Sequence, residues 1–73
     1  MEHYDETILK FVNSLNVDLI KDVRLQTKSY GNYHCVCGQR IKRAYIFKNI
    51  KNHKACVVGY HCLQYVADFL EWN

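Results

Sequence analysis

The first part of the chain carries apolar side chains with the spacing of one helical face. Four of them follow the i, i+3, i+4, i+7 pattern: Ile8, Phe11, Val12 and Leu15. This pattern predicts an amphipathic helix over residues 5–15, with Asp5 or Thr7 available as its N-terminal cap. We expect the apolar face of this helix to close one side of the core.

The period changes in the next segment. Apolar and polar residues alternate from Val23 to Lys28, as in a half-exposed strand. Ser29–Tyr33 contains a Gly-Asn pair and predicts a turn. Residues 41–50 are rich in β-branched and aromatic side chains, and the polar residues 51–54 separate them from a second apolar run at 55–58. We expect these two runs to pair as an antiparallel hairpin.

Helical spacing returns near the end of the chain, after a glycine that breaks the second strand. Seven residues form its apolar face: Leu63, Val66, Ala67 and Leu70, widened by Tyr65, Phe69 and Trp72. The predicted order is helix, strand, cysteine knuckle, hairpin and helix, which is an α+β fold. We expect one small domain over residues 1–73, in which a helical segment (1–21) precedes the strand, knuckle, hairpin and C-terminal helix (22–73).

Composition limits what this core can contribute. The chain has 73 residues, of which 49% are hydrophobic, 14% aromatic and 23% charged, as is typical of a folded domain. A core of this size supplies only about 3 to 5 kcal/mol of net stability, so such domains commonly add disulfides, a metal or a partner chain. The four cysteines and four histidines are the candidates for this addition.

Two absences in the sequence bear on the compartment. The chain has no apolar stretch of the about 7 to 15 residues that a secretory signal requires, and none of the roughly 20 that a membrane-spanning helix requires. We therefore expect an intracellular, cytoplasmic protein with no membrane partner. In a reducing compartment, four thiols are better suited to metal binding or redox chemistry than to structural disulfides.

The residues that carry chemistry lie in two short segments. Cys35 and Cys37 are separated by one residue and followed by Gly38, which suits a tight knuckle whose glycine takes a left-handed conformation. Cys62 follows the point where strand gives way to helix, and the positive end of the helix dipole would favour its thiolate. The hairpin brings the two segments together. Four nitrogen or sulfur ligands in a tetrahedron describe a structural zinc site, and thiolates favour Zn²⁺ over magnesium or calcium.

The predicted zinc ligands are Cys35, Cys37, His61 and Cys62. The fourth position stays open between His61 and Cys56, with His34 or His53 as further alternatives, because cysteine and histidine are both ordinary zinc ligands. Cys56 also lies in the apolar run at 55–58, where a cysteine is usually a small buried hydrophobic residue. The alternative for the whole set is four unrelated core thiols. Because metal binding in small modules is worth on the order of 10 to 16 kcal/mol, we expect the metal-free chain to be partly unfolded.

These residues resemble the small zinc-knuckle, treble-clef-like accessory proteins of bacteriophages and large DNA viruses. The shared pattern is C-x-C-G, a hairpin, then V-G-x-x-C entering a helix, here Cys35–Gly38 through Val58–Cys62. The chain departs from a treble-clef finger in having C-x-C instead of C-x-x-C, and in its adjacent His61 and Cys62. The resemblance implies a compact structural metal site in a viral or phage accessory protein that acts on nucleic acid or on a host protein.

Charge is unevenly distributed along the chain. The formal net charge is +3, but residues 24–54 contain eight basic residues and no Asp or Glu. The eight are Arg24, Lys28, Arg40, Lys42, Arg43, Lys48, Lys51 and Lys54. With Tyr30, Tyr33 and Tyr45 among them, they predict a basic surface suited to phosphate contact and base stacking, so nucleic acid is the expected partner. The alternative is that they form only the solvated face of a hairpin.

Two other function classes are open. A regulatory module that docks on and modulates a host protein would use the two terminal helices, where acidic residues lie beside Tyr4, Phe69 and Trp72. An enzyme is the third class, and we expect no catalytic activity. The chain has no H-x-E or H-E-x-x-H motif to serve a catalytic zinc, and so short a chain leaves little room for a substrate cleft.

Overall fold

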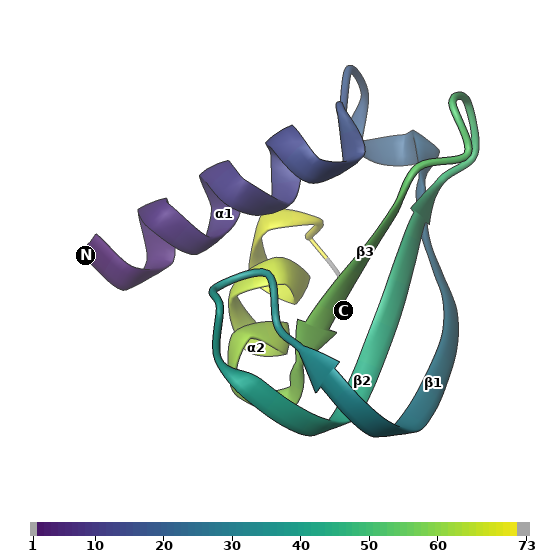
Figure 1. Cartoon of the computed structure of the whole chain (residues 1–73). Coiled ribbons are helices and arrows are strands. Elements are labelled where there is room, and N and C mark those ends of the chain that lie inside the picture. The colour runs from purple at the N-terminus through teal and green to yellow at the C-terminus, as the bar shows by residue number, and fades with distance from the viewer. Residues whose placement is uncertain (1, 72–73) are drawn as a thin grey trace.

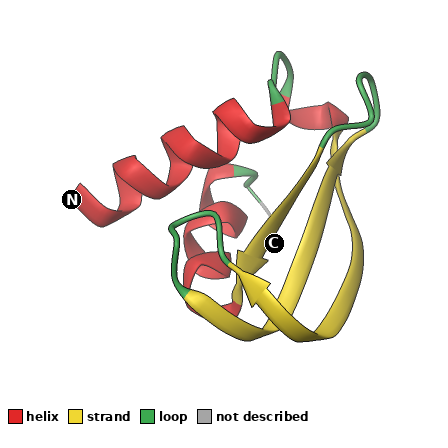
Figure 2. Cartoon of the chain, in the orientation of Figure 1, coloured by secondary structure: helices red, strands yellow, loops and turns green. Residues whose placement is uncertain are grey.

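Two helices and a three-stranded antiparallel sheet make up residues 2–71, the part of the chain that the computed structural model describes (Figures 1 and 2). The elements in chain order are α1 (Glu2–Leu15), a single 3₁₀ turn η1 (Ile20–Asp22), β1 (Val23–His34), β2 (Arg40–Asn49), β3 (Ala55–Gly59) and α2 (Tyr60–Phe69). The α+β class and the predicted order of helix, strand, knuckle, hairpin and helix are both confirmed.

The sheet has the order β1-β2-β3, and β2 pairs antiparallel with both neighbours. The turn predicted at Ser29–Tyr33 is wrong, because β1 continues through it and Tyr33 pairs with Ile41. The Gly-Asn pair produces a shift of register between Tyr30 and Tyr33 instead of a reversal of the chain. Pairing with β2 on both sides of the Gly-Asn pair outweighs its local turn preference, and the chain reverses only at the knuckle.

Helix α1 begins at Glu2, earlier than predicted, and both predicted caps therefore lie inside it. No glycine or proline interrupts the residues before Thr7, so nothing stops the helix from extending toward the N-terminus. Thr7 is buried, at 2% exposure. The predicted apolar face is confirmed, since Phe11 and Leu15 are fully buried.

The core lies where α1 and α2 pack against the sheet (Figure 1). Phe11 of α1 meets Phe47 of β2 edge to face, with ring centroids 5.4 Å apart, and both side chains are fully buried. Val58 of β3 and Val66 of α2 belong to the same cluster. Burial of Val66 confirms the apolar face predicted for α2, whereas Trp72, assigned to the same face, lies outside the described residues.

Two asparagines join the end of α1 to the β2–β3 turn. Asn49 Nδ2 and Asn52 Nδ2 both donate to the carbonyl oxygen of Leu15, each at 3.0 Å, and so satisfy a carbonyl that the helix end leaves free. The Oδ1 atoms of the same two residues accept hydrogen bonds from the backbone amides of Lys51 and Lys54, each at 2.9 Å. The turn is thereby fixed to the helix end at the point where β3 begins.

Replacing Asn49 is expected to destabilise the fold more than replacing Asn52. Asn49 is 2% exposed, whereas Asn52 is exposed, and a buried polar group that loses its partner costs about 1 to 3 kcal/mol. Asn49→Ala should lower the free energy of unfolding by about 2 kcal/mol in urea denaturation of the metal-loaded protein. Asn52→Ala is the matched control and should lose clearly less; equal losses would show that burial of Asn49 is not the cause.

Candidate metal centre

The chain reverses between β1 and β2 in a knuckle formed by residues 35–39. The backbone amide of Cys35 donates to the carbonyl of Gln39 at 2.8 Å, and the amide of Gly38 donates to the carbonyl of Cys35 at 2.8 Å. Gly38 has a φ of 96°, a value that a residue with a side chain rarely adopts. The conformation predicted for this glycine is thus confirmed, and the tight turn brings the thiols of Cys35 and Cys37 close together.

Two hydrogen bonds attach the knuckle to β3. The amide of Val36 donates to the carbonyl of Val57 at 2.9 Å, and the amide of Gly59 donates to the buried Sγ of Cys35 at 3.2 Å. Gly59 ends β3 and is also the N-cap of α2. Gly59 therefore donates to the Cys35 sulfur and also caps the helix that carries Cys62. Through this one residue the two cysteine segments are linked.

A side chain at Gly59 is expected to weaken metal binding. A Cβ there would lie 3.0 Å from Cγ2 and 3.3 Å from Cδ1 of Ile41, and in ordinary contact with Cβ of Cys35 at 3.6 Å. Crowding of the kind met at Ile41 costs about 1 to 3 kcal/mol. Gly59→Ala should therefore lower zinc affinity about tenfold in competition titrations against a chromophoric chelator. Adding Ile41→Ala to Gly59→Ala removes the crowding atoms and should restore most of the zinc affinity. If the double variant instead loses the sum of the two single-variant losses, the explanation is contradicted.

Three sulfur atoms come together where the knuckle meets the start of α2. The Sγ atoms of Cys35, Cys37 and Cys62 all lie within 4.8 Å of one another, and all three thiols are free. With Zn–S bonds of about 2.3 Å, neighbouring sulfurs of a tetrahedral site lie about 3.8 Å apart, so small side-chain movements suffice for all three to bind one ion. Three of the four predicted ligands thus form a cluster compatible with a small zinc-binding domain.

Burial and mutual contact decide the protonation of this three-cysteine cluster. Burial, together with the neighbouring thiols, raises the pKa of Cys62 to about 12. Burial would also raise the pKa of Cys37, but hydrogen bonds from the Gln39 backbone and from the two other thiols outweigh it, and this pKa is lowered. In the absence of a metal, burial thus favours the protonated thiol of Cys62. A divalent cation reverses this balance, because a coordinating thiol is deprotonated outright.

Within the described residues 2–71, the three-cysteine cluster includes none of the other candidate ligands, which are His61, Cys56, His34 and His53. His61 is exposed, and its ring meets Tyr65 edge to face, with centroids 6.2 Å apart. Cys56 is buried in β3, where burial raises the pKa of its thiol to about 11, as expected for a cysteine that acts as a small hydrophobic residue. His34 at the end of β1 and His53 in the β2–β3 turn are both exposed.

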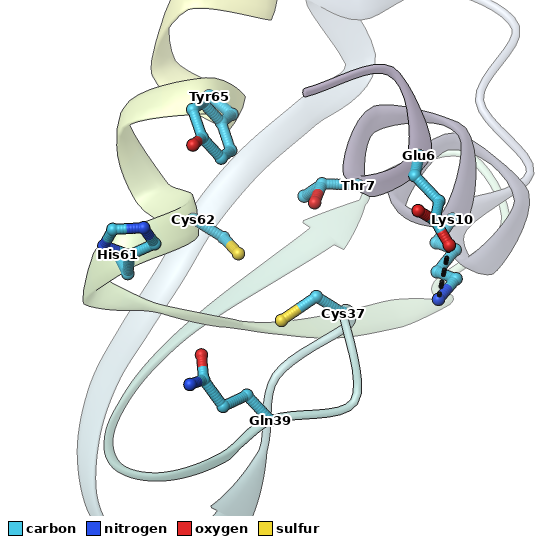
Figure 3. Close-up of a pocket in the computed structure, with 8 residues that line it drawn as sticks. All are labelled: Glu6, Thr7, Lys10, Cys37, Gln39, His61, Cys62 and Tyr65. Carbon is cyan, nitrogen blue, oxygen red and sulfur yellow. Dashed lines mark ion pairs between the residues drawn. The ribbon is translucent and has the colours of Figure 1, made fainter. Parts of the chain in front are cut away.

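A cavity of about 680 Å³ opens beside the three-cysteine cluster (Figure 3). Its wall is formed by residues of α1, the knuckle and α2: Glu6, Thr7, Lys10, Cys37, Gln39, His61, Cys62 and Tyr65. Lys10 and Glu6 lie one turn apart on α1, and Lys10 Nζ is 3.7 Å from Glu6 Oε1. Sequence reasoning does not predict this contribution of α1, since nothing in the local pattern distinguishes these polar residues from an ordinary solvated helix face.

The structure does not bring all eight predicted basic residues to one surface. Lys51 and Lys54 lie in the β2–β3 turn, at the opposite end of β2 from the knuckle. Arg24 and Lys48 are paired across β1 and β2 near that same end. Arg40 lies at the knuckle end, as the first residue of β2.

One of the remaining basic residues, Arg43, meets two exposed tyrosines. The guanidinium carbon of Arg43 lies 5.7 Å from the ring centroid of Tyr30 and 5.6 Å from that of Tyr60. Tyr30 is 74% exposed and Tyr60 is 66% exposed. Together with Lys42 these residues line a shallow hollow of about 460 Å³. We call Tyr30, Lys42, Arg43 and Tyr60 the tyrosine–arginine cluster.

The other predicted aromatic residues are differently placed. Tyr45 is buried at 7% exposure, with Lys28 Nζ 5.8 Å from its ring centroid. Tyr33 is half-buried, and its hydroxyl lies 2.8 Å from Ser29 Oγ. The sequence analysis does not include Tyr60 in the basic surface. Tyr60 contacts Arg43 because α2 begins directly after β3, which places its first residue beside β2.

The fold and the site define a small α+β domain with a three-cysteine cluster compatible with zinc. No family model, curated protein or solved structure matches this chain. Among the described residues, no helix is both long enough and apolar enough to cross a membrane.

Proposed function

We propose that this protein is a small structural-zinc domain that binds nucleic acid through the tyrosine–arginine cluster. Cys35, Cys37 and Cys62 would hold the ion, which supplies folding stability instead of catalysis. The resemblance to zinc-knuckle proteins of phages and large DNA viruses supports a role as a viral or phage accessory factor. The observation that carries nucleic-acid binding is the contact of Arg43 with two exposed tyrosine rings.

Two exposed aromatic rings beside a positive charge offer stacking surfaces for a nucleobase. Tyr30 and Tyr60 each leave most of their surface uncovered, and stacking of a base on such a ring is worth about 1 to 3 kcal/mol. The guanidinium of Arg43 is charged at any physiological pH, so a positive charge lies beside the stacked base. Stacking of this kind requires unpaired bases, which favours single-stranded nucleic acid.

Phosphate contacts would come from the basic residues around the tyrosine–arginine cluster. Lys42 lies in the hollow, and Arg40 is two residues away at the start of β2. Contact with about four phosphates of a single strand predicts that the logarithm of the affinity falls with the logarithm of salt concentration at a slope of about −3. Double-stranded DNA would be bound more weakly, because its bases are already stacked.

Fluorescence anisotropy of labelled oligonucleotides tests the proposal directly. The zinc-loaded protein should bind single strands at low salt, and Tyr30→Ala or Tyr60→Ala should each weaken binding about 5- to 100-fold, corresponding to the loss of one stacked base. Arg43→Ala should weaken binding further, since it removes a positive charge and also the guanidinium contact with both tyrosine rings.

A matched charge control is available in the β2–β3 turn. Lys51→Ala removes one positive charge far along the sheet from the tyrosine–arginine cluster, so its effect should be small and should shrink further as salt is raised. No association with any nucleic acid at low salt would reject the proposal. An effect of Lys51→Ala as large as that of Arg43→Ala would reject the assigned surface.

Docking on a host protein remains the second candidate, but the structure favours it less. The Tyr4 hydroxyl donates to Asp68 Oδ2 at 3.1 Å, and its ring packs edge to face on Tyr65 at 5.6 Å. Phe69 packs against the core. Two of the three aromatic residues expected to form a docking surface thus have partners within the chain, and Trp72 lies outside the described residues.

A further inference from the structure

We propose that the fourth coordination position of the zinc ion opens into the cavity beside the three-cysteine cluster and takes a thiolate or imidazole donor from a small molecule. This inference rests on the proposed zinc centre. It concerns the one tetrahedral position that the three clustered cysteines leave unfilled.

The three sulfurs divide between the core and the cavity. Cys35 Sγ is buried and accepts the amide hydrogen bond of Gly59, on the side where the knuckle meets β3. Cys37 and Cys62 both line the cavity, and Figure 3 shows their sulfur atoms pointing toward one another across it. An ion held by all three sulfurs would therefore lie at the cavity wall, with its remaining position on the accessible side.

The other donors of the chain lie outside the three-cysteine cluster that would hold the ion. His61 lines the same cavity, but it directly precedes Cys62 in α2, and successive helical side chains point about 100° apart around the axis. Its ring lies against Tyr65 and outside the cluster. Cys56 is paired with Phe47 in the sheet and buried in the core. The Glu6 carboxylate lies within ion-pair distance of Lys10.

The cavity has the size and lining of a small-molecule site. Its volume of about 680 Å³ is within the range of about 300 to 1,000 Å³ common for such sites. The hydroxyl of Thr7, the ammonium of Lys10 and the ring of Tyr65 offer polar and apolar contacts to the body of a ligand. Zinc already bound by thiolates accepts nitrogen or sulfur readily, and a thiol ligand would give up its proton to solvent on coordination.

Cobalt(II) substitution of the full chain tests the inference by spectroscopy. Sulfur-to-cobalt charge-transfer absorption shows whether the ion is held by cysteines, and the visible d–d bands respond to the fourth ligand. Adding imidazole or 2-mercaptoethanol should shift the d–d bands saturably while the cobalt stays bound. Unchanged d–d bands at high probe concentration would overturn the inference. Failure of cobalt to bind the cysteines at all would instead reject the proposed zinc centre.

Three variants identify the source of the fourth ligand. His61→Ala and Cys56→Ala should leave the cobalt spectrum without added probe unchanged, and a changed spectrum in either would assign that residue as the ligand and overturn the inference. Lys10→Trp places a bulky side chain at an exposed position of the cavity wall on α1, away from the knuckle. It should weaken probe binding at least tenfold while cobalt affinity stays within twofold; unaltered probe binding would contradict entry through this cavity.

Discussion

Chelation of the bound zinc is expected to unfold the domain. The core is small, and a chain of this length obtains about 3 to 5 kcal/mol from packing alone, whereas zinc binding contributes on the order of 10 to 16 kcal/mol to the folding of small modules. The three-cysteine cluster also joins the knuckle to α2, and the Gly59–Cys35 hydrogen bond attaches the knuckle to the end of β3, where α2 begins. Circular dichroism and a thermal melt with and without EDTA measure the effect.

The four cysteines supply a matched comparison for the same effect. Cys62→Ser removes a clustered sulfur and should abolish the cooperative melt or weaken zinc affinity by orders of magnitude. Cys56→Ser changes a thiol that is equally buried but lies outside the cluster, so it should retain zinc and lose about 1 to 3 kcal/mol, the cost of a buried polar group. The same zinc affinity in both variants would show that the cluster does not bind the ion.

Phe11→Ala should produce the second largest loss of stability. The Phe11 ring is fully buried and packs edge to face on Phe47, and truncation of a buried phenylalanine costs about 3 to 5 kcal/mol. In the zinc-loaded protein the free energy of unfolding in guanidinium should fall by this amount.

Leu9 is the control residue on the same helix. It is 61% exposed, and Leu9→Ala should change stability by less than about 0.5 kcal/mol, as is usual for surface positions. Comparable losses in Leu9→Ala and Phe11→Ala would mean that α1 does not pack through the face described above.

Local patterns of burial were sufficient to predict most of the fold. Phe11 and Leu15 recur on one side of α1 because one face of the helix must be covered, and that requirement is visible in a short window of sequence. The knuckle was also predictable, since a glycine after two closely spaced cysteines marks a tight turn that Gly38 indeed makes. Such features depend on neighbours in the chain.

The features that sequence reasoning missed depend on distant neighbours. The turn expected at Ser29–Tyr33 is absent because both sides of the Gly-Asn pair are held by pairing with β2. The local pattern predicts Thr7 as a helix cap, whereas the structure places it inside α1 and in the wall of the cavity that Cys62 also lines. Tyr60 adds an exposed ring to Arg43 only because α2 starts directly after β3. Each requires the packed arrangement of the elements, which no short window contains.

Native mass spectrometry of the full chain tests the three-cysteine zinc site most directly. One spectrum of the folded protein and one after acid denaturation report the mass of any bound ion, the protons that it displaces and the number of subunits. We predict one zinc ion per chain in the folded protein, lost on acid denaturation and greatly reduced in Cys62→Ser but retained in Cys56→Ser. A folded chain that carries no metal after preparation with zinc, or that binds it equally in both variants, would contradict the site.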